Sequence, residues 1–168
     1  MLSGISGAGK STLGMALGDY LTDRGRKVTI MDGDSLRKFF DGEFRYSARD
    51  RLMVSRILAY GAHLLSGQGI DVILATMLSQ PGARDFLSKN VDFVEVFLDV
   101  KLEQCIQTDP KEVYKENLGK STPDVVGYDL HFSRPRDPDL TIETHVEPPS
   151  ESLHRIIEFL KTQKMFGM

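Results

Sequence analysis

A short stretch near the start of the sequence has the composition of a phosphate-binding loop. The P-loop pattern G-x-x-x-x-G-K-[ST] is matched without a mismatch by Gly4, Ile5, Ser6, Gly7, Ala8, Gly9, Lys10 and Ser11, and Thr12 follows. Glycines suit a loop that folds around a phosphate, and amides at the following helix start bind anions. We expect Lys10 to reach the β- and γ-phosphates and the Ser11 hydroxyl to bind Mg²⁺. The stretch predicts binding of a nucleoside triphosphate.

Two acidic residues, Asp32 and Asp34, bracket Gly33 directly after a predicted strand over residues 27–31. Ligands of open parallel sheets bind beyond the carboxyl ends of the strands, so both acids should face the same crevice as the P-loop. One interpretation is a helix N-cap with an acidic neighbour. The favoured interpretation is functional: one acid acts as a general base or as a water-mediated Mg²⁺ ligand in phosphoryl transfer.

Basic residues gather in the next part of the chain. They are Arg37, Arg45, Arg49, Arg51 and Arg56. We expect Ser47 to cap a helix running to about residue 66, with Arg49 and Arg56 on its solvated face. Arg37 and Arg51 are better candidates for holding an acceptor anion, because arginine binds phosphate and sulfate through two hydrogen bonds.

The pattern of elements along the chain predicts how these residues are positioned. Strands over 27–31, 71–78, 93–100 and 140–144 alternate with helices over 10–24, 47–66, about 83–89, 101–108 and 109–117, and a last helix follows residue 148. This order predicts an α/β fold: a three-layer P-loop kinase domain over 1–168, with a mostly parallel five-stranded sheet and helices on both faces. Residues 1–3 are short for a buried first strand, which is therefore either clipped or unusually short. The polar segment of about 110–139, punctuated by glycine and proline, is interpreted as a mobile lid.

Composition narrows the class of partner. A net charge of −3 and a pI near 5.8 argue against a general nucleic-acid surface. The sequence has no apolar run approaching the roughly 20 residues that span a bilayer, which argues against a membrane protein. The single cysteine, Cys105, suits a cytoplasmic protein and is interpreted as a small packed hydrophobe.

Several motifs, taken together, resemble the adenylylsulfate (APS) kinase family over nearly the whole chain. They are Leu2–Thr12, Met31-Asp32-Gly33-Asp34 with Arg37, Phe97-Leu98-Asp99, Asp109-Pro110-Lys111, Tyr114-Lys115, Gly127-Tyr128-Asp129 and Pro138-Asp139-Leu140. The resemblance implies transfer of the γ-phosphate of ATP, with Mg²⁺, to the 3′-hydroxyl of adenylyl sulfate. It also implies a cytoplasmic enzyme that acts on a small molecule and forms a homodimer.

The resemblance also implies roles for individual residues. Lys10 and Asp32 would be catalytic, with Asp32 orienting or deprotonating the acceptor hydroxyl, and Lys111 would join the P-loop residues Gly4, Ser6, Gly7, Ala8, Gly9, Lys10, Ser11 and Thr12 in binding the nucleotide. The acceptor would be bound by Asp34, Arg37, Tyr46, Arg51, Ser79 and Lys120. Ser79 aligns only approximately with a serine-proline loop of the family.

Three departures from the family pattern fall on the acceptor side. Val54 stands where the family has asparagine, Val125 where a lid phenylalanine stacks on the acceptor adenine, and Pro123 near an expected lysine, for which Lys120 could substitute. Tyr46 keeps an aromatic ring on the opposite wall. Losing one face of such a clamp costs about 1–3 kcal/mol of stacking. Two alternatives therefore remain: the same chemistry on another nucleotide-like or sugar acceptor, and a catalytically silent ATP-binding regulatory protein.

Overall fold

The computed structural model describes residues 1–80, 82–109, 112–117, 125–128 and 130–163. Within these residues five parallel strands form one sheet in the order β2-β3-β1-β4-β5. The strands are β1 (Leu2–Ser3), β2 (Val28–Asp32), β3 (Asp71–Ala75), β4 (Val96–Asp99) and β5 (Leu140–Glu143). The parallel five-stranded sheet predicted from the sequence is confirmed.

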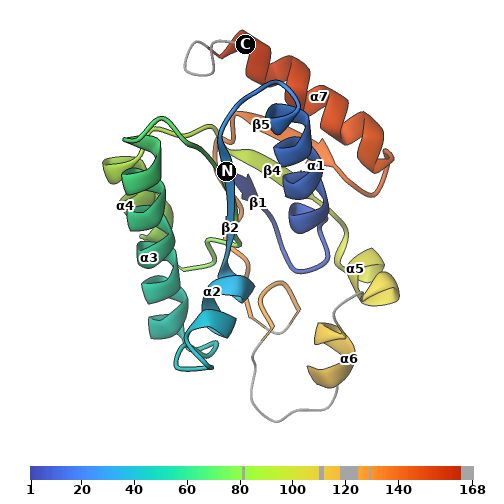
Figure 1. Ribbon diagram of the computed structural model, residues 1–168. Coiled ribbons are helices and arrows are strands. Elements are labelled where there is room, and N and C mark those ends of the chain that lie inside the picture. Colours follow the sequence, from blue (N-terminus) through green and yellow to red (C-terminus); the bar gives the residue numbers. More distant parts are fainter. Residues whose placement is uncertain (81, 110–111, 118–124, 129, 164–168) are drawn as a thin grey trace.

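Helices cover both faces of this sheet, as Figure 1 shows. They are α1 (Lys10–Thr22), α2 (Gly33–Phe39), α3 (Ala48–Ser66), α4 (Ala83–Asn90), α5 (Leu102–Thr108), α6 (Val113–Asn117) and α7 (Pro149–Thr162). The α3 and α4 helices pack together on one side, and α1 and α7 pack together on the other. Within the described part of the chain, every helix is too short or too polar to span a lipid bilayer.

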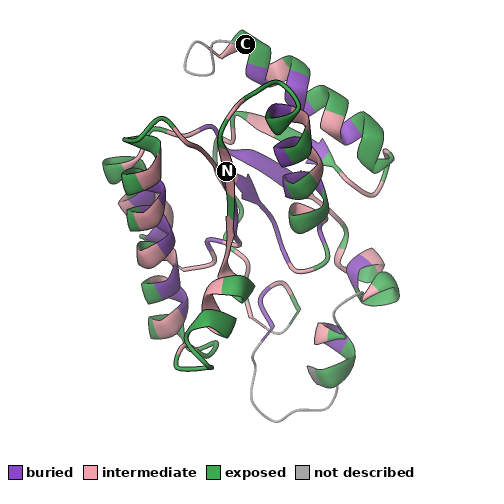
Figure 2. Cartoon of the chain, in the orientation of Figure 1, coloured by how far each residue is buried: buried purple, intermediate pink, exposed green. Residues whose placement is uncertain are grey.

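The buried residues concentrate between the sheet and these helices, where Figure 2 colours them purple. In β4, Val96, Phe97 and Leu98 are all buried, as expected for a strand that is covered on both faces. One hydrophobic cluster joins α1 and α7 to the sheet, and a second joins α3 and α4 to it. The α/β sandwich therefore holds the carboxyl ends of the strands, and the loops that follow them, on a rigid base.

Several element boundaries differ from those predicted. The strands predicted over 71–78 and 93–100 are shorter, since β3 ends at Ala75 and β4 begins at Val96. The helical segment predicted from residue 109 begins at Val113. The structure also contains α2, which the sequence indicates only through its N-cap. Ser47 caps α3 as predicted, because its hydroxyl accepts a hydrogen bond from the Asp50 amide at 3.1 Å.

Candidate functional site

The P-loop connects β1 to α1 and takes a conformation that depends on its glycines. A Cβ on Gly4 would lie 2.7 Å from the carbonyl oxygen of Leu98, so only glycine fits this approach to β4. Gly9 caps α1 with a φ of 90°, in the left-handed region. Lys10 Nζ donates hydrogen bonds to the carbonyl oxygens of Gly4 at 2.9 Å and Ile5 at 2.7 Å. The ammonium group therefore lies along the loop whose amides form the anion site.

Asp32 ends β2 and at the same time caps α2. Its Oδ1 accepts hydrogen bonds from the amides of Asp34 at 2.9 Å and Ser35 at 2.8 Å, and its Oδ2 accepts one from the Ser35 hydroxyl at 2.7 Å. The N-cap interpretation is thus correct, and it does not compete with a functional role. The same contacts hold the carboxylate of this half-buried residue in one orientation at the end of the strand.

The register of the sheet brings Asp32 to the edge that carries the P-loop. Asp32 pairs with Ala75 of β3, and Ala75 pairs in turn with Leu2 of β1. Asp32 is therefore level with Leu2, two residues before the P-loop begins at Gly4. Since all three strands are parallel, their carboxyl ends lie at the same edge of the sheet, where ligands of open parallel sheets bind.

A pair of arginines holds an aromatic ring beside α2 and α3. The Tyr46 ring lies 4.8 Å from the guanidinium carbon of Arg37 and 5.3 Å from that of Arg51. Arg51 is buried and donates from Nε to the Tyr46 carbonyl oxygen at 2.7 Å, and Arg37 donates to the Gly33 carbonyl oxygen at 3.0 Å. Asp34 is exposed, and its carboxylate lies 4.0 Å from Arg37. The structure thus gathers Asp34, Arg37, Tyr46 and Arg51 into one polar wall.

The segment that follows β4 contacts the P-loop through Tyr114 of α6. The Asp109 carboxylate accepts hydrogen bonds from the amides of Tyr114 at 3.0 Å and Lys115 at 2.9 Å, which orients the first turn of α6. The Tyr114 hydroxyl donates to the Ser6 carbonyl oxygen at 2.9 Å, and burial raises the pKa of Tyr114. Sequence reasoning noted Tyr114 only as part of a family motif. Its role required knowing that α6 lies against the loop.

Cys105 of α5 also packs under the P-loop. A Cβ placed on Gly7 would lie 3.3 Å from the Cβ of Cys105, so the helix approaches the loop closely. Cys105 is only 1% exposed, and burial raises the pKa of its thiol. The prediction that this cysteine is a packed small hydrophobe is confirmed.

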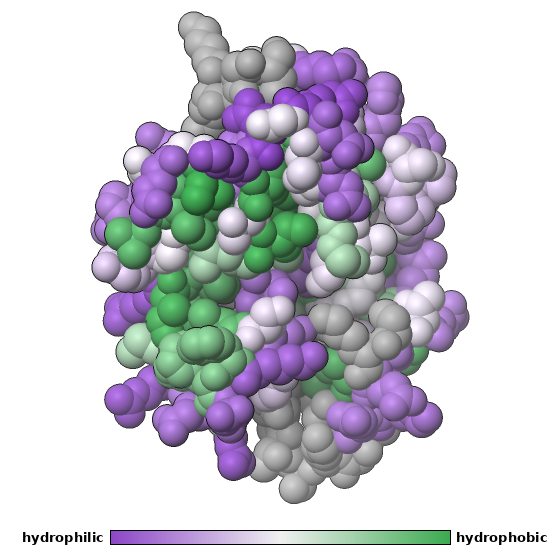
Figure 3. All heavy atoms as spheres, in the orientation of Figure 1, coloured by the Kyte–Doolittle hydropathy of each residue, from purple (hydrophilic) through white to green (hydrophobic). Residues whose placement is uncertain are grey.

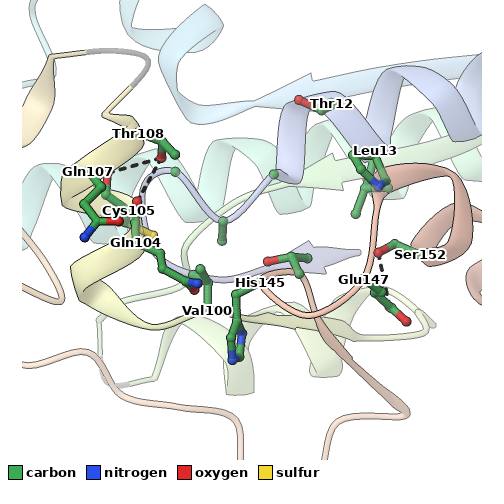
Figure 4. A pocket seen from close by; sticks show the side chains of 15 residues that line it. Thr12, Leu13, Val100, Gln104, Cys105, Gln107, Thr108, His145, Glu147 and Ser152 are labelled. Carbon is green, nitrogen blue, oxygen red and sulfur yellow. Dashed lines mark hydrogen bonds between the residues drawn. The ribbon is translucent and has the colours of Figure 1, made fainter.

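A pocket of about 350 Å³ lies beside the P-loop, between α5 and the segment that leads from β5 into α7 (Figure 4). The P-loop forms one wall through Gly7, Ala8 and Gly9, and the opposite walls include Gln104 and His145. Its size falls within the range of small-molecule sites, about 300–1,000 Å³. Sequence analysis did not identify Gln104 or His145, since nothing in the local pattern places these two segments together.

The part of the predicted lid that the structure describes packs onto the P-loop and β4. A Cβ on Gly127 would lie 2.8 Å from Cγ2 of Ile5, and the Phe132 ring stacks on Phe97 with ring centroids 6.1 Å apart. Arg134 forms an ion pair with Asp99. The described part of this segment thus contacts the P-loop at Ile5 and β4 at Phe97 and Asp99.

The remaining predicted residues divide into three groups. Lys111, Lys120, Pro123 and Asp129 lie outside the described residues. Ser79 is half-buried and follows Leu78, whose φ of 42° is unusual for a residue with a side chain. Val54 and Val125, at the positions of departure from the family, are both buried in the hydrophobic core.

Comparison with known proteins gives a consistent result. Residues 1–143 match the model of the family described as adenylylsulphate kinase. An adenylyl-sulfate kinase of Clostridium acetobutylicum is 33% identical, over 97% of this chain and 82% of its own length. One of Pseudomonas aeruginosa is 36% identical, over 97% of this chain and 85% of its own length. The solved structure of the Mycobacterium tuberculosis APS kinase in complex with AMPPNP and APS superposes with a TM-score of 0.89 at 29% identity, covering 96% of this chain and 95% of that one.

Proposed function

Because this chain belongs to the adenylylsulphate kinase family, we propose that it transfers the γ-phosphate of ATP to the 3′-hydroxyl of adenylyl sulfate. The observation that carries the proposal is the shared sheet edge, where the register sets Asp32 level with the strand that enters the P-loop. The P-loop follows β1, and Asp32 lies at the end of β2, separated from β1 by β3. A phosphate-binding loop and an acid at the same edge of the sheet are two parts that a phosphoryl transfer between bound nucleotides uses.

The P-loop holds the donor nucleotide in this proposal. Its amides and the ammonium of Lys10 bind the phosphates and offset the charge that develops during transfer. The donor set suits Mg²⁺, which kinases bind through one or two protein oxygens together with phosphate oxygens. The exposed Ser11 hydroxyl at the first turn of α1 would hold the ion, which would neutralise phosphate charge. In the described part of the chain, no cluster of three or more acidic, histidine or cysteine residues offers another metal site.

Asp32 orients or deprotonates the hydroxyl group of the acceptor in this proposal. Three hydrogen bonds from α2 fix its carboxylate, so little reorganisation is needed before it accepts a hydrogen bond or proton from the hydroxyl. A carboxylate held in this way can orient or deprotonate a hydroxyl group that binds beside it.

The wall of Asp34, Arg37, Tyr46 and Arg51 is assigned to the acceptor nucleotide. Guanidinium groups suit its sulfate and phosphate oxygens, and an aromatic ring suits the base. Ser79 and Lys120 stay predictions for the same side, and Lys111 for the donor side. Because Val125 is a core residue here, the ring on the other face of the acceptor base must come from elsewhere or be absent.

The test is ADP release with ATP and Mg²⁺, comparing adenylyl sulfate with a panel of nucleotides and sugars. Saturable turnover on adenylyl sulfate is the expected result. The family assignment does not favour the two alternatives raised by the sequence. Turnover only on another acceptor would overturn the choice of substrate, and tight ATP binding without turnover would overturn the kinase assignment.

Three further expectations belong to this proposal. The segment over about 110–139 would act as a lid, supported by its packing on Ile5 and Phe97. The enzyme would work as a cytoplasmic homodimer. Support for a dimer comes from large hydrophobic side chains that are exposed on β2 and α3, which are Ile30, Met53, Tyr60 and Leu64. The face shown in Figure 3 also carries apolar residues among the polar ones. Sedimentation of the wild type and of Leu64→Glu tests the dimer, because a buried glutamate would dissociate it.

A further inference from the structure

Two residues that line the pocket beside the P-loop each carry an unusual buried polar atom. Gln104 Oε1 and His145 Nδ1 are buried and have no hydrogen-bond partner, and they are the two such side-chain atoms among the residues that the structure describes. Both residues line the same pocket. A buried polar atom without a partner is costly, and in native proteins it calls for an explanation. Their occurrence in one pocket points to a ligand that supplies the missing partners.

The position of the pocket indicates which part of a ligand would lie there. Its wall includes Gly7, Ala8 and Gly9 of the P-loop, so a nucleotide whose phosphates bind the loop would extend its nucleoside into this space. In Figure 4, Gln104 comes from α5 and His145 comes from the segment that follows β5, and both lie near Val100. Two segments that are distant in sequence therefore converge on the far end of the site.

We propose that Gln104 and His145 recognise the base of the donor nucleotide, and that Gln104 selects adenine through its 6-amino group. This inference rests on the proposed function, because it takes the P-loop ligand to be a nucleoside triphosphate. The carboxamide oxygen of Gln104 accepts a hydrogen bond, and the 6-amino group of adenine donates one. Glutamine pairs with the amino group and N7 of adenine in just this way when proteins read DNA.

A base with a carbonyl group at position 6 fits this arrangement less well. Its oxygen would face the Gln104 oxygen, so the carboxamide must turn and present its amino group instead. His145 Nδ1 adds a second polar contact, as donor or acceptor according to its tautomer. Gln104 therefore favours adenine moderately. A side chain that can only accept hydrogen bonds would discriminate more strongly between the two bases.

The experiment compares ATP with inosine triphosphate, which differs from it at position 6 of the base. In Gln104→Leu, kcat/KM with ATP is expected to fall about three- to tenfold while the value with inosine triphosphate changes less, because only the amino group loses its partner. In Gln104→Glu, the ratio of the two values is expected to rise, since a carboxylate offers no donor to a carbonyl. Gln68→Leu is the control, the same substitution at an exposed glutamine outside the site.

Calorimetric titration with ADP and inosine diphosphate measures the same preference without any acceptor. Lower affinity of His145→Leu for both nucleotides is expected. The inference would be overturned if the ratio of kcat/KM with ATP to kcat/KM with inosine triphosphate were unchanged in both Gln104 variants, and the nucleotide affinity of His145→Leu were also unchanged. Failure of the proposed function is distinguishable, because wild-type protein would then bind nucleotides with base preference but release no ADP with adenylyl sulfate.

Discussion

The hydroxyl of Tyr114 donates a hydrogen bond to the carbonyl oxygen of Ser6, at 2.9 Å and across 108 residues of sequence. Ser6 lies in the middle of the P-loop, and Tyr114 is only 1% exposed. The bond ties α6 to the loop that carries the anion site. It also explains the motif that begins at Asp109, because the Asp109 carboxylate orients the helix turn from which Tyr114 reaches the loop.

Removal of this hydroxyl tests the connection. Tyr114→Phe leaves the Ser6 carbonyl without its partner and is expected to lower the free energy of unfolding by about 1 kcal/mol. The loop would also be held less firmly, so KM for ATP should rise more than kcat falls. Chemical denaturation and steady-state kinetics measure the two effects. Tyr60→Phe, at an exposed site on α3, is the control, and equal effects of both changes would contradict this role.

Replacement of Lys10 tests the P-loop assignment. Lys10→Ala is expected to abolish turnover with every acceptor, because the loop loses the cation that offsets charge on the transferred phosphoryl group. Thermal denaturation should still show a cooperative transition, since Lys10 is only half-buried and lies outside both hydrophobic clusters. Appreciable residual phosphoryl transfer would contradict the kinase mechanism.

Substitutions at Asp32 separate its two roles. Asparagine is about as good an N-cap as aspartate, so Asp32→Asn should keep α2 in place and leave ATP affinity nearly unchanged. Loss of the charge is expected to reduce kcat by about 10² or more. Asp32→Ala should lose the same activity and in addition about 0.5–2 kcal/mol of stability. ATP affinity that collapsed in Asp32→Asn would instead make Asp32 a structural or metal-site residue.

Gly127 gives a test of the contact between the lid segment and the P-loop. Its φ is 91°, and an added Cβ would lie 2.8 Å from Cγ2 of Ile5. Gly127→Ala must therefore displace Ile5, and it is expected to cost about 1–3 kcal/mol beyond the backbone strain and to raise KM for ATP. Gly69→Ala is the matched control, with a φ of 73° and no neighbouring atom within 4 Å. An equal loss of stability in the two variants would show that the contact with Ile5 contributes nothing.

The sequence by itself determined the fold class and the parts of the site that are contiguous in the chain. The P-loop, the Asp32-Gly33-Asp34 turn and the alternation of strands with helices depend on local conformation and period, which neighbouring residues specify. Arg37 and Arg51 could be named from the chemistry of arginine with anions, and Tyr46 from the resemblance to the family. Their mutual contacts, in which the Tyr46 ring lies near both guanidinium groups, could not be predicted from the spacing of these residues in the sequence.

Only the tertiary structure decided which distant segments meet. The strand register sets Asp32 level with Leu2, α6 brings Tyr114 to Ser6, and α5 and the β5–α7 segment bring Gln104 and His145 to one pocket. The structure also shows that Val54 and Val125 are buried in the core, although the resemblance to the family places both positions on the acceptor side of the site. These outcomes depend on how helices pack on the sheet, and packing is governed by shape and burial summed over the whole core, which no local pattern contains.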